Sequence, residues 1–232
     1  MSAALSSRIA PLGDMALLVR VGERSDAATF QRVQALAQHL ERARLPGMVE
    51  YVPALTTVAV YYDPLRVSYG ALAAALEQAL DSLDPAATAP GRLLEIPVCY
   101  GGEFGGDLDV VAQHHGLSAA EVIAIHAGGE YFVQMLGFAP GFPYLGGMAE
   151  SIATPRRATP RIKVPAGSVG IAGAQTGIYP FETPGGWQLI GRTPLLLFRP
   201  QDDPPTLLQT GDRVRFEPIT PEEFATLQEM PQ

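Results

Sequence analysis

The sequence predicts an α+β protein with two domains, a small N-terminal α/β domain over residues 1–90 and a β-barrel domain over residues 91–232. In the first 90 residues, apolar side chains recur with the periods of strands and helices in the order β-α-β-β-α. In the second part, nearly half of the 24 glycines fall between Gly137 and Arg199. So dense a run of turn residues favours short strands and shaped loops over long helices.

The predicted elements of the first domain are a strand at 15–21, a helix at 26–42, strands at 48–52 and 56–62, and a helix at 69–83. Ser25 or Asp26 can cap the first helix, and Pro46-Gly47 follows its end. This order is close to the split-βαβ, ferredoxin-like arrangement, for which residues 92–100 would supply the fourth strand.

A linker is predicted over residues 84–91, DPAATAPG, from its composition. The later elements are helices at 108–115 and from the capping box Ser118-x-x-Glu121 to His126, then strands at 131–136, 168–172, 187–190, 195–199 and 214–218. A second capping box at 220–223 begins a terminal helix. Many short strands separated by turns indicate a closed or nearly closed barrel.

The composition limits the possible function classes. Hydrophobic residues make up 47% of the chain and charged residues only 17%, which fits either a surface covered by a partner or simply a large core. The net charge of −8 argues against nucleic-acid binding. Cys99 is the only cysteine, and no signal peptide or membrane span is evident. We therefore expect a cytoplasmic protein without nucleic-acid or membrane partners.

Several catalytic motifs are missing from the sequence. It has no GxxxxGK[ST] phosphate loop, no GxGxxG after a strand and no Gly-x-Ser-x-Gly elbow. It also lacks the CxxC and HExxH spacings, so we expect no bound metal.

A basic cluster lies inside the acidic second half. Residues 151–199 carry six basic side chains against the single acid Glu182. Such a local field attracts a carboxylate or a phosphate, although scattered solvated arginines are an equal alternative. The basic residues are Arg156, Arg157, Arg161, Lys163, Arg192 and Arg199.

Two polar residues are candidates for chemistry. His126 ends a predicted helix, where the helix dipole favours the protonated imidazole and a role in proton transfer. Its alternative role is to cap the helix. Gln175 offers one donor and one acceptor, which match the edge of a lactam or amide, or it braces its own loop.

The remaining candidates are binding residues. Lys163 is the only lysine and lies near the glycine-rich loop, where it could contact phosphate, although chance placement is the simpler explanation. Phe138, Tyr179 and Trp187 can wall an apolar pocket or belong to the core.

Long stretches of the second domain resemble a known family. The segments GFAPGFPYLGG, TPRRATPR, VPAGSVGIAGAQTGIYP and TPGGWQLIGRTPLLLF are similar to the family of 5-oxoprolinase B subunits, also called the Kip-inhibitor (KipI) or allophanate hydrolase subunit 1 family. The resemblance covers most of residues 95–218. It implies a cyclophilin-like barrel after a smaller α/β domain. It also marks His126, Gln175, Tyr179 and the Arg156-Arg157 pair as lying within family motifs.

The resemblance also implies an activity and partners. Together with a C component (KipA, or allophanate hydrolase subunit 2, type) and an A component (LamB/YcsF type), such a protein opens 5-oxo-L-proline to L-glutamate using ATP. The arginines would then face phosphate or the substrate carboxylate, Gln175 the lactam edge, and His126 a proton transfer. The alternatives are a KipI-type inhibitor of a sensor histidine kinase and a carboxyltransferase-type subunit related to urea carboxylase.

Overall fold

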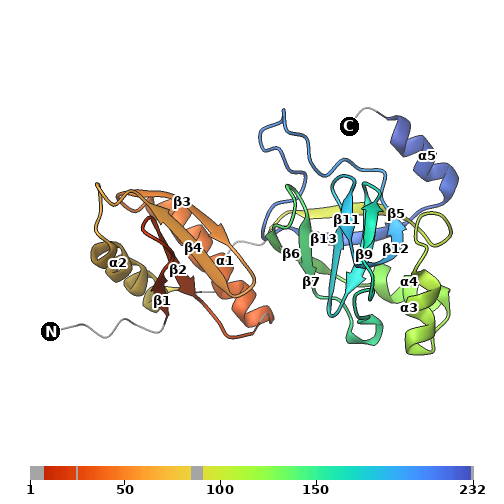
Figure 1. Cartoon of the computed structure of the whole chain (residues 1–232), viewed down its shortest axis with the longest axis horizontal. Coiled ribbons are helices and arrows are strands. Elements are labelled where there is room, and N and C mark those ends of the chain that lie inside the picture. The colour runs from red at the N-terminus through yellow and green to blue at the C-terminus, as the bar shows by residue number, and fades with distance from the viewer. Residues whose placement is uncertain (1–7, 25, 85–90, 231–232) are drawn as a thin grey trace. The chain divides into compact units, whose positions relative to one another are not determined.

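The computed structural model describes residues 8–24, 26–84 and 91–230, and the chain divides between residues 90 and 91 into two compact units (Figure 1). We call them the N-terminal unit and the barrel unit. The expected mixture of helices and strands and the closed barrel are both confirmed. Ser25 and most of the predicted linker lie outside the described residues.

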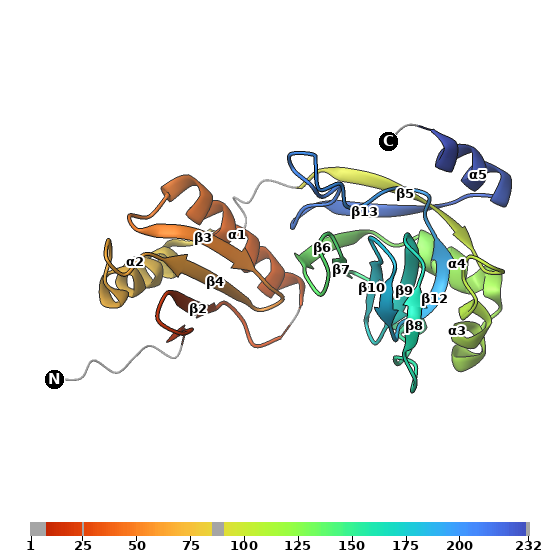
Figure 2. The ribbon, with the colours of Figure 1, turned by 45° about the horizontal axis from the view of Figure 1, so that its top comes forward.

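The N-terminal unit is a four-stranded sheet covered on one face by two helices (Figures 1 and 2). Its elements are β1 (Ile9–Pro11), β2 (Ala16–Arg20), α1 (Ala27–Ala43), β3 (Met48–Pro53), β4 (Thr57–Tyr62) and α2 (Tyr69–Ser82). The strands pair antiparallel in the order β1-β2-β4-β3. Consequently β2 and β3, the two strands that α1 connects, lie parallel on either side of β4.

The local sequence explains why α1 forms and packs as it does. The Asp26 side chain accepts a hydrogen bond from the Thr29 N–H at 2.8 Å and caps the helix. Val33, Leu36 and Leu40 lie on one side of α1 and are fully buried against the sheet. Burial of each such side chain contributes roughly 1.5–3 kcal/mol, so packing rather than helix propensity determines the position of α1.

The expectation that residues 92–100 supply the fourth strand of this sheet is wrong. That strand is β1, which pairs with β2 in a hairpin. Residues Leu93–Tyr100 instead form β5 of the barrel, where Ile96 and Val98 are fully buried. Local periodicity cannot distinguish the two sheets, because both would bury the same alternate side chains.

The barrel unit closes seven strands in the order β10-β7-β6-β13-β5-β12-β9. These strands are β5 (Leu93–Tyr100), β6 (Tyr131–Leu136), β7 (Pro143–Gly146), β9 (Ser168–Ala172), β10 (Gln175–Ile178), β12 (Gln188–Arg192) and β13 (Arg213–Pro218). Only the β13–β5 pair is parallel, and all the other pairings in the barrel are antiparallel. A two-stranded ribbon of β8 (Arg161–Val164) and β11 (Thr183–Gly185) stands beside the barrel.

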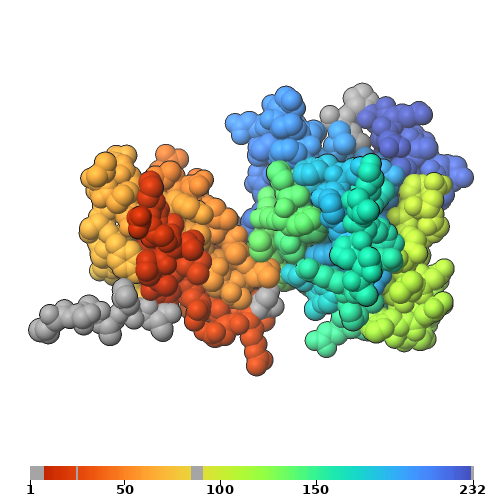
Figure 3. Space-filling view, viewed as in Figure 1, coloured from red at the N-terminus to blue at the C-terminus, as the bar shows by residue number. Residues whose placement is uncertain are grey.

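Helices complete the barrel unit. They are α3 (Leu108–His115), α4 (Ala119–Ala127), the short 3-10 helix η2 (Glu150–Ile152) and α5 (Pro221–Glu229). α3 and α4 lie side by side at one side of the barrel (Figure 2). The capping boxes predicted at Ser118 and Thr220 both form. In the space-filling view, the green-to-blue segment that contains the glycine-rich motifs occupies the middle of the visible face of the barrel unit (Figure 3).

The expectation of a strand at 195–199 is wrong. Pro194 and Pro200 bracket this run and lack the N–H groups that a ladder needs. Its backbone instead pairs with the loop that follows, where the Leu207 N–H donates to the Leu197 carbonyl at 2.9 Å. β7, β8, β10 and β11 were not expected, because three or four residues are too few to show alternation. In the part of the chain that the structure describes, no helix is long and apolar enough to cross a membrane.

Candidate functional site

A pocket of about 270 Å³ opens on the barrel unit where the glycine-rich segments converge. It is lined by Phe138, Phe142, Tyr144, Arg156, Arg157, Pro160, Tyr179, Pro184, Gly185, Gly186 and Trp187. These residues come from β7, from β11, and from the loops around them. Of the six side chains that the sequence suggested for substrate or phosphate binding, five therefore lie together, and only Lys163 does not.

The floor of the pocket is a cluster of aromatic rings around Phe142. The Phe142 ring lies edge-on to Tyr144, Tyr179 and Trp187, with centroid distances of 5.0, 5.2 and 5.3 Å. Edge-to-face contacts at such distances are favourable and fix the rings relative to one another. The result is a rigid apolar floor that can pack against one face of a flat ligand.

Phe138 stands at the pocket in an unusual conformation. Its φ of 67° lies in the left-handed region, and its side chain is 62% exposed although it contacts Phe142. The left-handed conformation costs an L-residue about 1–2 kcal/mol, and no large burial offsets it here. Burial in the core therefore does not explain the strained backbone at this position.

The Tyr179 hydroxyl is used inside the protein. The side chain is 1% exposed, and burial raises the pKa of its phenol. The backbone N–H of Trp187 offsets part of this rise in the pKa. A Cβ on Gly185 would come within 2.3 Å of this oxygen, so only glycine fits there. Tyr179 thus shapes the Gly185–Trp187 wall.

Three arginines stand at or beside the pocket in different states. The Arg156 guanidinium lies 5.9 Å from the centroid of the Trp187 ring, and it forms no ion pair with any described residue. Arg157 and Arg161 both donate to one oxygen of Asp107, at 2.9 and 2.8 Å. Two arginines share one carboxylate and the third is unpaired, so the site keeps a surplus of positive charge for an anionic ligand.

Asp107 was not among the residues that the sequence suggested. It is 2% exposed and lies in the YGGEFGGDL segment, far along the chain from the arginines. A buried acid must be paired, and the basic cluster in the sequence contains too few acids to satisfy its arginines. That imbalance was the available signal, but it does not indicate which distant carboxylate supplies the missing charge.

His126 lies away from the pocket, inside the barrel. It is fully buried, and burial lowers its pKa to about 3, so the expectation of a protonated imidazole at the helix end is wrong. Desolvation outweighs the helix dipole because no described acid compensates a buried charge there. The ring stacks on Phe216 with centroids 4.5 Å apart.

The hydrogen bonds of His126 determine its tautomer. The Thr176 hydroxyl donates its proton to the Gly170 carbonyl at 2.9 Å, so it must accept from His126 Nε2–H at 3.0 Å. Nδ1 is then unprotonated and accepts from the Tyr100 hydroxyl at 2.8 Å. Both ring nitrogens of this neutral imidazole are satisfied within the barrel.

The other two candidates also lie outside the pocket lining. Gln175 lies on β10, which pairs with β7. Its side-chain N–H group donates a hydrogen bond to the side-chain oxygen of Gln134 at 3.4 Å. Lys163 is on the β8–β11 ribbon and pairs with Glu182 at 3.0 Å, with both side chains more than half exposed. Among the described residues, no group of three or more His, Cys, Asp or Glu side chains could hold a metal ion.

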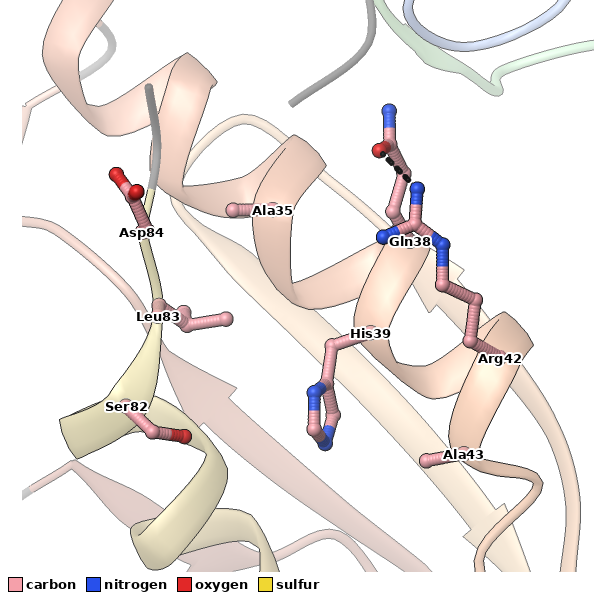
Figure 4. Close-up of a pocket in the computed structure, with 8 residues that line it drawn as sticks. All are labelled: Ala35, Gln38, His39, Arg42, Ala43, Ser82, Leu83 and Asp84. Atoms are coloured by element: carbon pink, nitrogen blue, oxygen red, sulfur yellow. Dashed lines mark hydrogen bonds between the residues drawn. The ribbon is translucent and has the colours of Figure 1, made fainter. Parts of the chain in front are cut away.

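A second hollow, of about 400 Å³, lies in the N-terminal unit between α1 and the end of α2 (Figure 4). Its lining comprises Ala35, Gln38, His39, Arg42, Ala43, Ser82, Leu83 and Asp84. In the close-up, Arg42 reaches Gln38 on one side of α1 while His39 points toward α2 (Figure 4). The charged groups therefore do not converge, and we take the barrel pocket as the candidate site.

Comparison with known proteins gives consistent matches along the chain. The family model described as "Carboxyltransferase domain, subdomain C and D" matches residues 7–208. The B subunit of the 5-oxoprolinase of Bacillus subtilis (strain 168) is 48% identical over 232 residues, which cover 96% of this chain and 97% of that protein. The urea amidolyase of Lachancea kluyveri is a more distant relative, 24% identical over 91% of this chain and 13% of its own length.

Two solved structures are also similar. The conserved uncharacterized protein PH0987 from Pyrococcus horikoshii is 49% identical, with 93% of this chain and 99% of that chain covered and a TM-score of 0.57. The crystal structure of TTHA0988 is 41% identical with a TM-score of 0.76. That match covers 88% of this chain but 40% of TTHA0988, so this chain corresponds to less than half of the longer polypeptide.

Proposed function

Because the chain belongs to the family of 5-oxoprolinase B subunits, we propose that it is the B subunit of an ATP-dependent 5-oxoprolinase, which opens 5-oxo-L-proline to L-glutamate together with an A and a C component. The observation that carries this proposal is the match over nearly the whole length of curated relatives with that name. The match covers 96% of this chain and 97% of that relative, so it extends through both the N-terminal unit and the barrel unit.

The barrel pocket supports a small acidic substrate. Pockets for drug-sized ligands occupy roughly 300–1,000 Å³, whereas this one measures about 270 Å³. 5-Oxoproline has a compact ring with a planar amide and a single carboxylate. We propose that the ring lies against Trp187 and Phe138 while the carboxylate, or a phosphate formed on the lactam oxygen, meets Arg156 and Arg157. In this proposal Tyr179 does not contact the substrate but packs against Gly185 and fixes the Gly185–Trp187 wall.

Opening the lactam requires activation, because resonance stabilises its C–N bond. ATP would supply this by phosphorylating the carbonyl oxygen, which makes the carbonyl carbon more electrophilic. Water then adds to that carbon, the C–N bond breaks as the ring nitrogen takes up a proton, and the acyl phosphate that remains is hydrolysed to glutamate and inorganic phosphate. A nucleotide is larger than the pocket can hold beside the lactam, so we place nucleotide binding in the assembled complex. The part of this chain is to bind the acid, orient it and stabilise its negative charge.

His126, Gln175 and Lys163 have no part in substrate contact in this proposal. The buried, hydrogen-bonded imidazole of His126 serves the barrel core. The Gln175 side chain is hydrogen-bonded to Gln134, and Lys163 forms an exposed ion pair with Glu182. Proton transfer by His126 and lactam binding by Gln175, both expected from the sequence, therefore give way to the aromatic and arginine residues of the pocket.

The finer features of the assembly are proposals as well. We place the boundary of two domains at residues 90 and 91, with a cyclophilin-like barrel after a variant of the ferredoxin-like unit whose fourth strand precedes the others. The partners would be a C component of the KipA type and an A component of the LamB/YcsF type. Because the TTHA0988 polypeptide is more than twice as long as the part that matches, it supports the proposal that this chain works together with a further protein. The single free cysteine fits the cytoplasm.

Reconstitution tests the proposal. The purified chain is combined with the A and C components of the Bacillus subtilis enzyme, 5-oxoproline and ATP, and glutamate is measured. We expect formation that depends on this chain and on ATP, and a loss of about tenfold or more in kcat/KM for Arg156→Gln. Absence of glutamate when the Bacillus subtilis B component restores activity in the same mixture would reject the assignment.

The distant similarity to urea amidolyase favours a second candidate, a carboxyltransferase-type protein. The same mixture distinguishes the two when it is assayed with and without added bicarbonate, and with urea in place of 5-oxoproline. Hydrolysis of the lactam requires no bicarbonate, whereas a carboxyl transfer does. Turnover of urea or of 5-oxoproline that depends on bicarbonate would favour the carboxyltransferase.

A further inference from the structure

We propose that Asp107 is a positioning residue that holds Arg157 in place for the ligand, an inference that rests on the proposed function of the barrel pocket. Asp107 itself is not part of the pocket lining, whereas Arg157 is. Any effect of Asp107 on the ligand must therefore pass through the arginines that it binds.

The contacts of the Asp107 carboxylate divide between the arginines and the barrel. Oδ1 accepts from Arg157 Nη1 at 2.9 Å and from Arg161 Nη2 at 2.8 Å. Oδ2 accepts from the backbone N–H of Leu189 at 2.8 Å, and the Asp107 N–H donates to the Leu189 carbonyl at 2.8 Å. Leu189 lies in β12, two residues after Trp187 in the pocket wall. Asp107 thus links the guanidinium groups to the strand that carries that wall.

The position of Asp107 on its own helix supports a role beyond local structure. Asp107 is the N-cap residue of α3, yet its side chain makes no capping hydrogen bond. A capping aspartate typically contributes about 1 kcal/mol to a helix, and this one directs its carboxylate to the arginines instead. Its side chain is 3% exposed, against 35% for Arg157 and 26% for Arg161. The fixed acid is inside, and the arginines extend outward from it.

The net charge of the Asp107 cluster and its unpaired N–H donors both favour the binding of an anion. One carboxylate shared by two guanidinium groups leaves one positive charge uncompensated. Among the described residues, Arg157 Nε and Arg161 Nη1 are buried and have no hydrogen-bond partner. A guanidinium that is held still but only partly satisfied loses little freedom when an anion binds, so the anion meets a preorganised charge.

A comparison of Asp107→Asn with Asp212→Asn tests the inference in the full-length chain. Asp212 is a matched control, because it is 4% exposed, is bonded to Arg92 and to the Gln209 N–H, and touches no pocket residue. In the reconstituted enzyme, D107N should raise the KM for 5-oxoproline about tenfold with a smaller change in kcat. D212N should leave KM within about twofold, since it weakens only the barrel.

A double-mutant cycle shows whether Asp107 acts through Arg157. If it does, D107N combined with Arg157→Gln raises KM no further than Arg157→Gln alone. If the fold-increases in KM of the two single variants multiply in the double variant, or if KM rises equally in D107N and D212N, the inference is overturned.

A measurement without turnover separates this inference from the proposed function. In nuclear magnetic resonance of the wild-type chain, the Nη1–H group of Arg157, which donates to Asp107 and is assigned by its loss in the Arg157→Gln variant, should exchange slowly with solvent. It should exchange rapidly in D107N but not in D212N. A freely exchanging Arg157 in the wild type would refute the inference even if D107N failed to fold. A protected Arg157 in a chain that forms no glutamate would leave the positioning role standing and reject only the enzyme assignment.

Discussion

The neutral, buried imidazole of His126 predicts how the stability of the barrel unit depends on pH. Its pKa of about 3 in the folded chain compares with 6.5 for a free imidazole. Between these values the unfolded chain binds a proton that the folded chain does not, so the free energy of unfolding falls as pH falls from 6.5 toward 3. Above pH 6.5 both states are neutral and the penalty vanishes. From about pH 7 to about pH 5 this single group should remove about 2 kcal/mol.

Urea unfolding at about pH 7 and about pH 5 measures the effect. Trp187 is the only tryptophan and is 5% exposed in the same unit, so its fluorescence reports unfolding of the barrel. The wild type should lose about 2 kcal/mol more than His126→Gln between the two pH values, because the variant cannot bind the extra proton. Thr176→Val, which keeps the imidazole but removes its acceptor, is the matched control and should retain the wild-type pH dependence. Equal losses in the wild type and His126→Gln would refute the argument.

Three further predictions concern the pocket. Gly185→Ala should destabilise the barrel by about 1–3 kcal/mol, because the new Cβ would lie 2.3 Å from the Tyr179 hydroxyl, whereas Gly186→Ala, 3.6 Å from its nearest neighbour, should have little effect in the same urea titration. Phe138→Gly should keep stability within about 1 kcal/mol, since relief of the left-handed strain offsets the entropy of glycine, yet raise the KM for 5-oxoproline; an unchanged KM would contradict its binding role. Lys163→Ala removes an exposed ion pair worth at most about 1 kcal/mol and should leave both KM and kcat unchanged.

The sequence predicted the pocket lining better than the pairing around it. One turn-rich segment contains four of the pocket residues, so its composition was enough to predict them as candidates for the site. They are Phe138, Arg156, Tyr179 and Trp187. The Asp107 contact to Leu189 joins residues 82 positions apart, and only the packing of α3 on β12 creates it. Local periodicity carries no information about such a contact.

The strands show the same division. Residues 168–172 and 131–136 were predicted with the observed bounds, because β-rich runs between turn residues show locally. A strand was expected over residues 92–100 and forms over Leu93–Tyr100, but its pairing with β13, and not its own pattern, places it in the barrel sheet. A strand specifies its inward face, whereas its neighbours are specified by the rest of the chain.

His126 and Arg157 differ in a way that separates structure from function in this molecule. Both are polar groups in or beside the barrel, and both were suspected from the sequence. The imidazole of His126 has a partner on each nitrogen and carries no charge, which is the state expected of a core residue. Arg157 shares its acid with Arg161 and keeps a buried donor without a described partner. Replacement of such a buried cluster of charges by apolar side chains of similar size is often neutral or stabilising, so stability is a weak reason to gather guanidinium groups around one carboxylate. We therefore expect a ligand to complete the pairing of the arginines, and we expect no contribution to binding from the titration of the histidine.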